Sequence, residues 1–227
     1  MAHPLDNAVW NALTGPRQTF AQRHGRAGRF DPEVAPFAAV EDADDPAAWS
    51  DLVELIGAGH SAVFLAPPVA PPEGWETTWR RPCHQLVATG VDTAGRQTEL
   101  LVLGADDVPE MIELIELTQP GPFALRTFEL GGYVGVRDDA GTLVAMAGER
   151  LAVDGFVEVS AVCTRPELRG TGLATALVRA VVAGIRARGD EAFLHVADNN
   201  LNALRLYLAL GFTERIMADA AIIKSPS

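Results

Sequence analysis

Cysteine and histidine are both scarce in this sequence of 227 residues, which has two cysteines and five histidines. Cys83 and Cys163 lie far apart and form no CxxC motif, so they predict two reduced, buried thiols and no disulfide framework. The histidines show no ligand spacing, such as positions i and i+4 of one helix. The sequence therefore predicts no metal site.

Basic residues are outnumbered, because 18 Lys and Arg stand against 30 Asp and Glu and give a formal net charge of -12 at pH 7. This negative charge repels a phosphate backbone or an anionic membrane surface, and it suits a cationic or amine substrate. The N-terminus has no basic segment followed by an apolar one, and the most apolar helix-like run, residues 172–188, is interrupted by Arg179 and Arg186. We therefore expect a cytoplasmic protein that binds neither nucleic acid nor membranes.

The first hundred residues are divided into short pieces by proline, including the PPVAPPEG stretch at residues 67–74. Asp45 and Pro46 are typical of a helix start. The segments predicted here are one helix and two buried strands, at residues 46–56, 61–65 and 84–88. Residues 1–100 are therefore expected to form an N-terminal α/β region of unclear role.

Residues 101–227 show a regular alternation of elements. Asp106 or Asp107 can cap a helix with Pro109 in its first turn, and Met111, Leu114 and Ile115 fall on one face of that helix. Three strands joined by tight turns follow, which predicts an antiparallel meander. The predicted segments after the first helix are 133–137, 143–151, 156–164, 172–188, 191–197, 201–210 and a last strand that ends at residue 223. The order is α-β-β-β-α-β-α-β.

One junction between a strand and a helix carries a chemical signal, the segment Arg169-Gly170-Thr171-Gly172-Leu173-Ala174. Glycines let successive backbone N–H groups approach an anion closely, and the helix N-terminus adds partial positive charge. Arg165 and Arg169 add cationic charge in an otherwise acidic protein. The junction therefore predicts a cradle for a diphosphate group, and because so short a pattern also arises by chance, its meaning depends on a second motif.

That second motif is NLNALRLYLALGF at residues 200–212. Together with the RxxGxA pattern that follows the strand, it resembles the two signature motifs of the GCN5-related N-acetyltransferases, a superfamily that uses acetyl-CoA. The resemblance covers residues 104–223, and EVSAVCTRPELRGTGLATALV is most similar to the FR47-like branch. It implies an α/β fold with a mixed central sheet, with an acetyltransferase domain at residues 101–227. Residues 1–100 are either a divergent, cofactor-free copy of this fold or an unrelated lid over the acceptor cleft.

The resemblance also implies which residues hold acetyl-CoA. The strand before the cradle splays from its parallel neighbour, so the exposed backbone of Val162, Cys163 and Thr164 is expected to pair with the pantetheine arm. Asn200 is expected to hydrogen-bond the pantetheine region. The cradle residues expected to bind the diphosphate are Arg169, Gly170, Thr171, Gly172, Leu173, Ala174 and Thr175. One cofactor site is expected, because no second RxxGxA motif occurs in residues 1–100.

Proton transfer requires an acid and a proton acceptor. The resemblance places the Tyr207 hydroxyl near the thioester sulfur, where a phenol can protonate the departing thiolate. The alternative is that Tyr207 only packs against the sheet. Cys163 alternates away from Val162 and has no histidine beside it in the sequence, so direct transfer is favoured over a covalent acyl-enzyme.

Two glutamates are candidates for the general base. Glu158 is favoured, because strand alternation predicts that it shares a face with Val162 and because it matches the strand glutamate of related histone acetyltransferases. Glu149, near the end of the preceding strand, is the second candidate. Either carboxylate can instead bind the substrate ammonium or pair with an arginine such as Arg150 or Arg126.

These residues predict an N-acetyltransferase that moves acetyl from acetyl-CoA to a primary amine by direct attack in a ternary complex. The acceptor is expected to be a small-molecule or peptide amine. The alternative function is a catalytically silent acyl-CoA-binding or regulatory module, for which Tyr207 and a cleft carboxylate would be dispensable.

Overall fold

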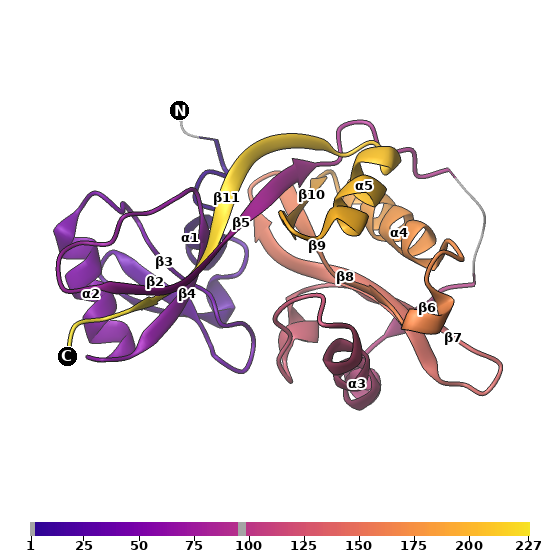
Figure 1. Ribbon diagram of the computed structural model, residues 1–227, viewed down its shortest axis with the longest axis horizontal. Coiled ribbons are helices and arrows are strands. Elements are labelled where there is room, and N and C mark those ends of the chain that lie inside the picture. The colour runs from indigo at the N-terminus through magenta and orange to yellow at the C-terminus, as the bar shows by residue number, and fades with distance from the viewer. Residues whose placement is uncertain (1–2, 95–98) are drawn as a thin grey trace.

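The computed structural model describes residues 3–94 and 99–227 and contains two β-sheets. The smaller sheet lies in the N-terminal region, has the order β1-β2-β3, and is antiparallel throughout. Helices α1 and α2 pack against it (Figure 1). These elements are α1 (Ala8–Thr14), β1 (Ala21–His24), β2 (Ala27–Phe30), β3 (Ala38–Val40) and α2 (Pro46–Ile56). Asp45 caps α2 as predicted, since its side chain accepts a hydrogen bond from the Ala47 N–H at 2.9 Å.

Among the residues that the structure describes, the larger sheet has eight strands in the order β4-β11-β5-β10-β9-β8-β7-β6. All neighbours in it are antiparallel except β9 and β10, which run parallel. The sheet is therefore mixed, as predicted, and the meander of β7, β8 and β9 is confirmed. Its strands are β4 (Ser61–Ala66), β5 (Glu76–Val87), β6 (Leu101–Leu103), β7 (Tyr133–Arg137), β8 (Leu143–Val153), β9 (Phe156–Thr164), β10 (Glu191–Ala197) and β11 (Thr213–Lys224).

Strand β5 joins the two regions of the chain. It lies between β10 and β11 and pairs with both, so strands from both sides of the predicted boundary at residue 100 form one sheet (Figure 1). That boundary stays a prediction. The sequence indicated only the buried end of β5, because residues 76–82 are largely exposed and carry no apolar alternation.

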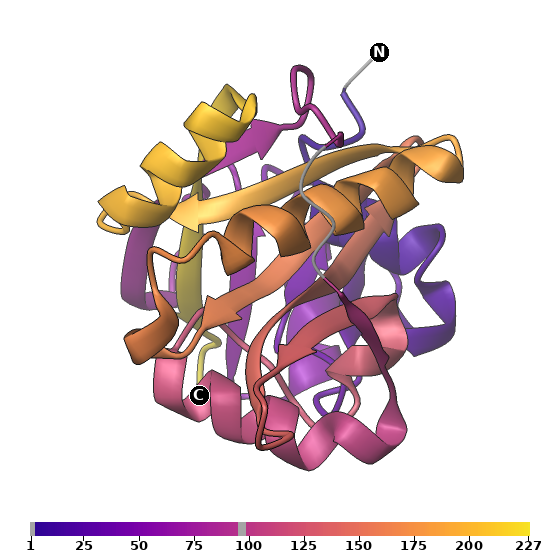
Figure 2. The ribbon, with the colours of Figure 1, turned by 90° about the vertical axis from the view of Figure 1, so that its right-hand side faces the viewer.

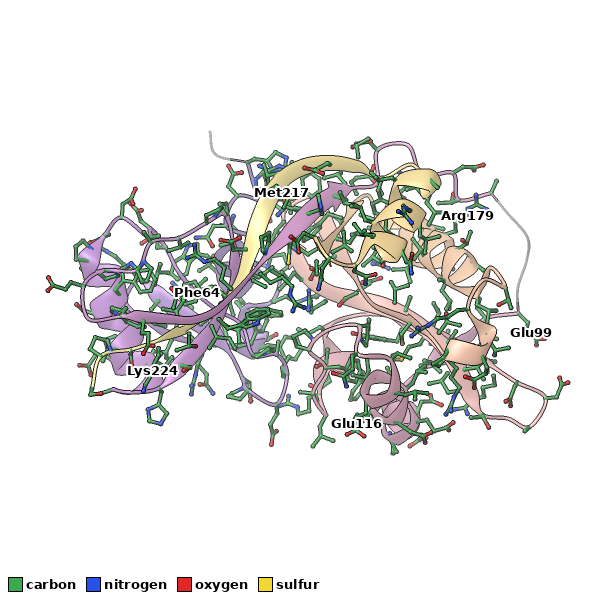
Figure 3. All side chains as sticks on the ribbon, viewed as in Figure 1. Phe64, Glu99, Glu116, Arg179, Met217 and Lys224 are labelled. Atoms are coloured by element: carbon green, nitrogen blue, oxygen red, sulfur yellow. The ribbon has the colours of Figure 1, made fainter. Side chains whose placement is uncertain are left out.

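Helices cover both faces of the large sheet. Helices α4 (Leu173–Ala187) and α5 (Leu201–Leu210) pack on one face over a core that includes Val157, Val159 and Leu194. Helix α3 (Val108–Thr118) packs on the opposite face, where its buried side chains meet Met146 and Cys163. Figure 2 shows α4 and α3 on opposite sides of the strands, and Figure 3 shows the labelled Arg179 on α4 and Glu116 on α3 pointing away from the sheet. The two faces are called the α4 face and the α3 face below.

The predicted face of α3 is confirmed, since Met111, Leu114 and Ile115 are buried. Asp107 stands at its N-cap position but makes no capping bond to the helix, because its carboxylate accepts hydrogen bonds from the Gly104 N–H and from Arg137. In the described part of the chain no helix is long and apolar enough to cross a membrane. The same residues contain no cluster of three His, Cys, Asp or Glu side chains that could hold a metal ion.

Candidate active site

Strands β9 and β10 part in the middle of the sheet. The last pair in their register is Glu158 with Phe193, although β9 continues to Thr164 and β10 to Ala197. Beyond Phe193, the one strand that pairs with β10 in the described part of the chain is β5, on its other side. The edge of β9 that faces β10 is therefore open after Glu158, which is the splay that the resemblance implied.

The glycine cradle follows β9 and opens α4. Gly170 and Gly172 have φ values of +82° and +92°, in the left-handed region that favours glycine, and no atom of the described residues lies within 4 Å of a Cβ built on either residue. Gly172 is the N-cap of α4 and makes no side-chain capping bond. Thr171 secures the turn, because its Oγ1 donates to the Leu168 carbonyl at 2.7 Å. The first N–H groups of α4 are thus left for an anion.

The cradle, the open end of β9 and α5 line one pocket of about 720 Å³. Ten of the eleven residues predicted to hold acetyl-CoA line it, namely Val162, Cys163, Thr164, Arg169, Gly170, Gly172, Leu173, Ala174, Thr175 and Asn200. Thr171 is the exception, since its side chain bonds the preceding turn. The sequence motifs therefore converge in space on one pocket.

Two polar residues near the cradle, Asn200 and Arg165, form hydrogen bonds within the protein. Asn200 caps α5, with Oδ1 accepting from the Ala203 N–H at 3.2 Å, and Asn200 lines the pocket. Arg165 is turned away from the cradle, because it donates to Glu113 at 2.7 Å and to the Leu143 carbonyl. The expected contribution of Arg165 to the cradle is therefore wrong.

Tyr207 lies on α5 and lines the same pocket. Its side chain is 7% exposed and its ring meets Phe212 edge-on with the centroids 5.7 Å apart. Burial is the main cause that raises the pKa of the Tyr207 phenol, and the nearby Cys163 raises it further. The phenol is therefore protonated at neutral pH. Burial also raises the pKa of the Cys163 thiol, to about 11, so this cysteine is a poor nucleophile.

A β-bulge in β9 changes which residues share a face. Met146 pairs with Cys163 and Gly148 with Ser160, so β9 has one residue more than β8 between these pairs, and Ala161 has a φ of +52°. Side chains before and after the bulge are therefore out of phase.

The packing confirms this switch. Val157, Val159 and Val162 all pack in the core under α4, so Glu158 points to the opposite face. The prediction that Glu158 shares a face with Val162 is therefore wrong, because simple alternation fails at the bulge.

Glu158 is fully buried in an ion pair. Arg150 donates to its two carboxylate oxygens from Nε and Nη2, each at 2.8 Å, and His195 Nδ1 lies 2.8 Å from Oε1. Burial alone would raise the pKa of Glu158, but the charge and hydrogen bonds of Arg150, with the bond from His195, lower it to about 2. A carboxylate with this pKa is a weak proton acceptor, and it does not line the pocket.

The bonds around His195 define its tautomer. Arg215 donates to Gln85 Oε1 at 2.7 Å, and Gln85 Nε2 donates to the Leu5 carbonyl at 3.1 Å. The same amide nitrogen lies 3.2 Å from His195 Nε2, which therefore accepts. His195 Nδ1 therefore carries the hydrogen that is donated to Glu158. These residues lock Glu158 as a structural anion.

Glu149 is also committed to structure. Arg188 donates to its Oε1 at 2.7 Å, the residue is 6% exposed, and it does not line the pocket. Its side chain packs so closely on Gly131 that a Cβ there would lie 2.5 Å from the Glu149 Cβ. The catalytic roles of Glu149 and Glu158 stay predictions that this geometry does not favour.

Sequence reasoning missed the wall of the pocket opposite the cradle. This wall is the C-terminal end of α3, with Thr118, Gln119 and Pro120. Gln119 has a φ of +52°, and its N–H closes the helix on the Ile115 carbonyl at 2.8 Å. The QPGP segment indicated only that a helix ended there. The remaining lining residues that were missed are Leu168, Asn202, Ala203 and Leu206.

Comparisons with known proteins agree on one family. The FR47-like protein model matches residues 133–220. A crystal structure from Novosphingobium aromaticivorans, described as an acetyltransferase from the GNAT family, is 41% identical, covers 100% of both chains and has a TM-score of 0.89. A GCN5-related N-acetyltransferase from Kribbella flavida, 19% identical with a TM-score of 0.68, covers 100% of this chain and 97% of its own and shares the fold.

One curated relative adds a more specific name. A mycothiol acetyltransferase from Thermobispora bispora is 41% identical over 93 residues, which are 38% of this chain and 31% of that protein. The match thus spans less than a third of the curated relative. The chain itself, by its end-to-end similarity to the Novosphingobium protein, belongs to the GNAT family of acetyltransferases.

Proposed function

We propose that the protein transfers an acetyl group from acetyl-CoA to a primary amine by direct attack in a ternary complex. The observation that carries this proposal is the single pocket in which the cradle, the open edge of β9 and the Tyr207 phenol meet. Each of these supplies a different requirement of the reaction: an anion site, a backbone edge and an acid.

The residues present fit acetyl-CoA. The glycine positions in the cradle leave open space where a side chain would stand, and the N–H groups of α4 are free to meet a diphosphate. Thr164 Oγ1 is buried at the pocket and has no hydrogen-bond partner among the described residues, so a polar ligand group there would satisfy it. Acetyl-CoA supplies a thioester, which is an acyl group activated toward amines.

The residues of the chain then bind, orient and move protons. The open edge of β9 orients the ligand arm, and a backbone N–H of that edge stabilises the oxyanion as the amine nitrogen bonds to the acetyl carbon. Tyr207 donates its proton to the sulfur as the carbon–sulfur bond breaks, while the attacking nitrogen loses its second proton to solvent, from which Tyr207 is reprotonated. The ammonium proton leaves to water before attack, because the buried carboxylates of Glu149 and Glu158 are held by arginines.

The alternative function, a silent acyl-CoA-binding module, would not need the Tyr207 hydroxyl. The test is transfer of labelled acetyl from acetyl-CoA to a panel of primary amines, with Tyr207→Phe as the matched variant. Transfer by the wild type that falls sharply in the variant, with unchanged acetyl-CoA affinity, supports the enzyme. Tight binding of acetyl-CoA without transfer to any amine would support the silent module.

A further inference from the structure

Tyr133 on β7 holds a polar group that the proposed reaction does not use. The residue is 1% exposed, and its hydroxyl has no hydrogen-bond partner among residues 3–94 and 99–227. A buried polar group without a partner destabilises a fold, and a phenylalanine at this position would fill nearly the same space without that cost. A ligand that bonds the Tyr133 hydroxyl would explain why a tyrosine stands at this position.

The position of the Tyr133 ring indicates where its hydroxyl lies. Tyr133 pairs with Gly148, and a Cβ on Gly148 would lie only 2.3 Å from the Tyr133 Cδ1, so the ring lies across β8 at its one position without a side chain. Gly148 in turn pairs with Ser160, next to the bulge at Ala161. Adjacent strands are about 4.8 Å apart, so a phenol that crosses one strand reaches the next.

The bulge separates Tyr133 from the pocket. Tyr133 packs in one core cluster with Cys163 and Ala161 on the α3 face, whereas Tyr207 packs on the α4 face. Cys163 also lines the pocket, and the sheet is open beside it because β10 has diverged. The two tyrosines therefore stand on opposite sides of the strand along which the acyl donor is proposed to lie.

We propose that Tyr133 positions the acceptor amine on the α3 face of the bulge, with its hydroxyl oxygen accepting a hydrogen bond from the amine nitrogen. This inference rests on the proposed function and names the side from which the amine attacks. Burial raises the pKa of Tyr133 as well, so the phenol is neutral and acts as a hydrogen-bond partner, and the proton route to water is unchanged.

Phe123 packs against Tyr133. Its ring meets the Tyr133 ring edge-on, with the centroids 5.7 Å apart, and it is half-buried. It belongs to the segment that leaves α3 at the pocket wall of Gln119 and Pro120. An amine that enters beneath this segment displaces Phe123 to reach the hydroxyl.

The experiment uses the fact that the full sequence has two tyrosines. Protein labelled at tyrosine Cζ with the NMR-active carbon isotope gives two signals, which Tyr133→Phe and Tyr207→Phe assign. The donor probe is a ketone analogue of acetyl-CoA with a methylene group in place of sulfur, and the amine probes are benzylamine and glycinamide. We expect the analogue alone to shift the Tyr207 signal and the amines, added afterwards, to shift the Tyr133 signal. Phe123→Ala should lower the amine concentration required.

The outcomes separate this inference from the proposed function. If the analogue leaves the Tyr207 signal unmoved, the proposed function fails, and the effect of the amines on Tyr133 is still read directly. If neither amine moves the Tyr133 signal, the inference is overturned. In addition, Tyr133→Phe should melt no lower than the wild type and lose on the order of 10-fold in kcat/KM for the amine, with acetyl-CoA affinity unchanged. Wild-type transfer by this variant would also overturn the inference.

Discussion

The two faces of the sheet beside the divergence of β9 and β10 are built in opposite ways. Toward α4, the glycines of the cradle and the first N–H groups of that helix line one side of an open pocket of about 720 Å³, whose other walls include the C-terminal end of α3. On the other face, Glu158 is buried with Arg150 and His195, and the Arg150 guanidinium lies 4.7 Å from the centre of the Phe37 ring. The proposed ligand contacts thus come mainly from the backbone, while the charged side chains Glu158, Arg150 and His195 pair with one another.

Filling the cradle should have the largest effect on this contrast. Gly172→Trp places a side chain in the open space before α4, so acetyl-CoA affinity should fall on the order of 1000-fold, or about 4 kcal/mol. Calorimetric titration measures the loss. Gly141→Trp is the matched control, because Gly141 also has a positive φ and open space, at a hairpin turn that does not line the pocket. Equal acetyl-CoA affinity in the two variants would show that the glycine cradle does not bind the ligand.

Breaking the buried ion pair should reduce stability more than binding. Glu158→Gln leaves the Arg150 charge buried without its partner, which we expect to cost about 3 kcal/mol of unfolding free energy. Chemical denaturation measures it, and acetyl-CoA affinity should stay unchanged. Unchanged stability together with lost turnover would instead support Glu158 as the general base.

The Glu158 carboxylate should also make the free energy of unfolding fall at acid pH. Because its folded-state pKa of about 2 lies below the ordinary 4.5, its contribution is fully present above pH 4.5 and is lost as the pH falls toward 2. We expect the wild type to lose roughly 3 kcal/mol over this window relative to Glu158→Gln. Parallel pH profiles of the two proteins would contradict this.

Removing the proposed acid should affect turnover alone. Tyr207→Phe keeps the ring against Phe212, so kcat should fall on the order of 100-fold while acetyl-CoA affinity and melting temperature stay near those of the wild type. Steady-state kinetics with any accepted amine provide the measurement. A variant with full turnover would show that Tyr207 only packs against the sheet.

The smallest expected effect is at Thr164. Its unpartnered Oγ1 predicts that Thr164→Val is slightly more stable than the wild type and binds acetyl-CoA about 5-fold more weakly. Thr171→Val is the matched control, because Thr171 bonds the Leu168 carbonyl and does not line the pocket. A loss of affinity only in the control would exchange the roles of the two threonines.

The cradle was predictable from the sequence because its geometry is local. Gly170 and Gly172 adopt positive φ values that favour glycine, so the backbone shape is written in residue types. Helices α4 and α5 follow the same logic, since Gly172 and Asn200 stand at their N-caps and Gly211 at the C-cap of α5, and β10 and α5 match the predicted bounds.

The other face was not predictable, because its decisive features are non-local. The bulge at Ala161 carries no glycine to announce it, and it reversed the expected face of Glu158. The partners of Glu158 come from β8 and β10, which only the assembled sheet brings together. The position of Tyr133 was not predictable for the same reason, since its ring lies across β8 only because Tyr133 pairs with Gly148.

The decisive measurement is a crystal structure of the protein with CoA bound. We expect the diphosphate on the N–H groups at the start of α4 and the pantetheine arm along the open edge of β9, with its sulfur next to Tyr207. CoA bound on the α3 face, or outside this pocket altogether, would contradict this expectation.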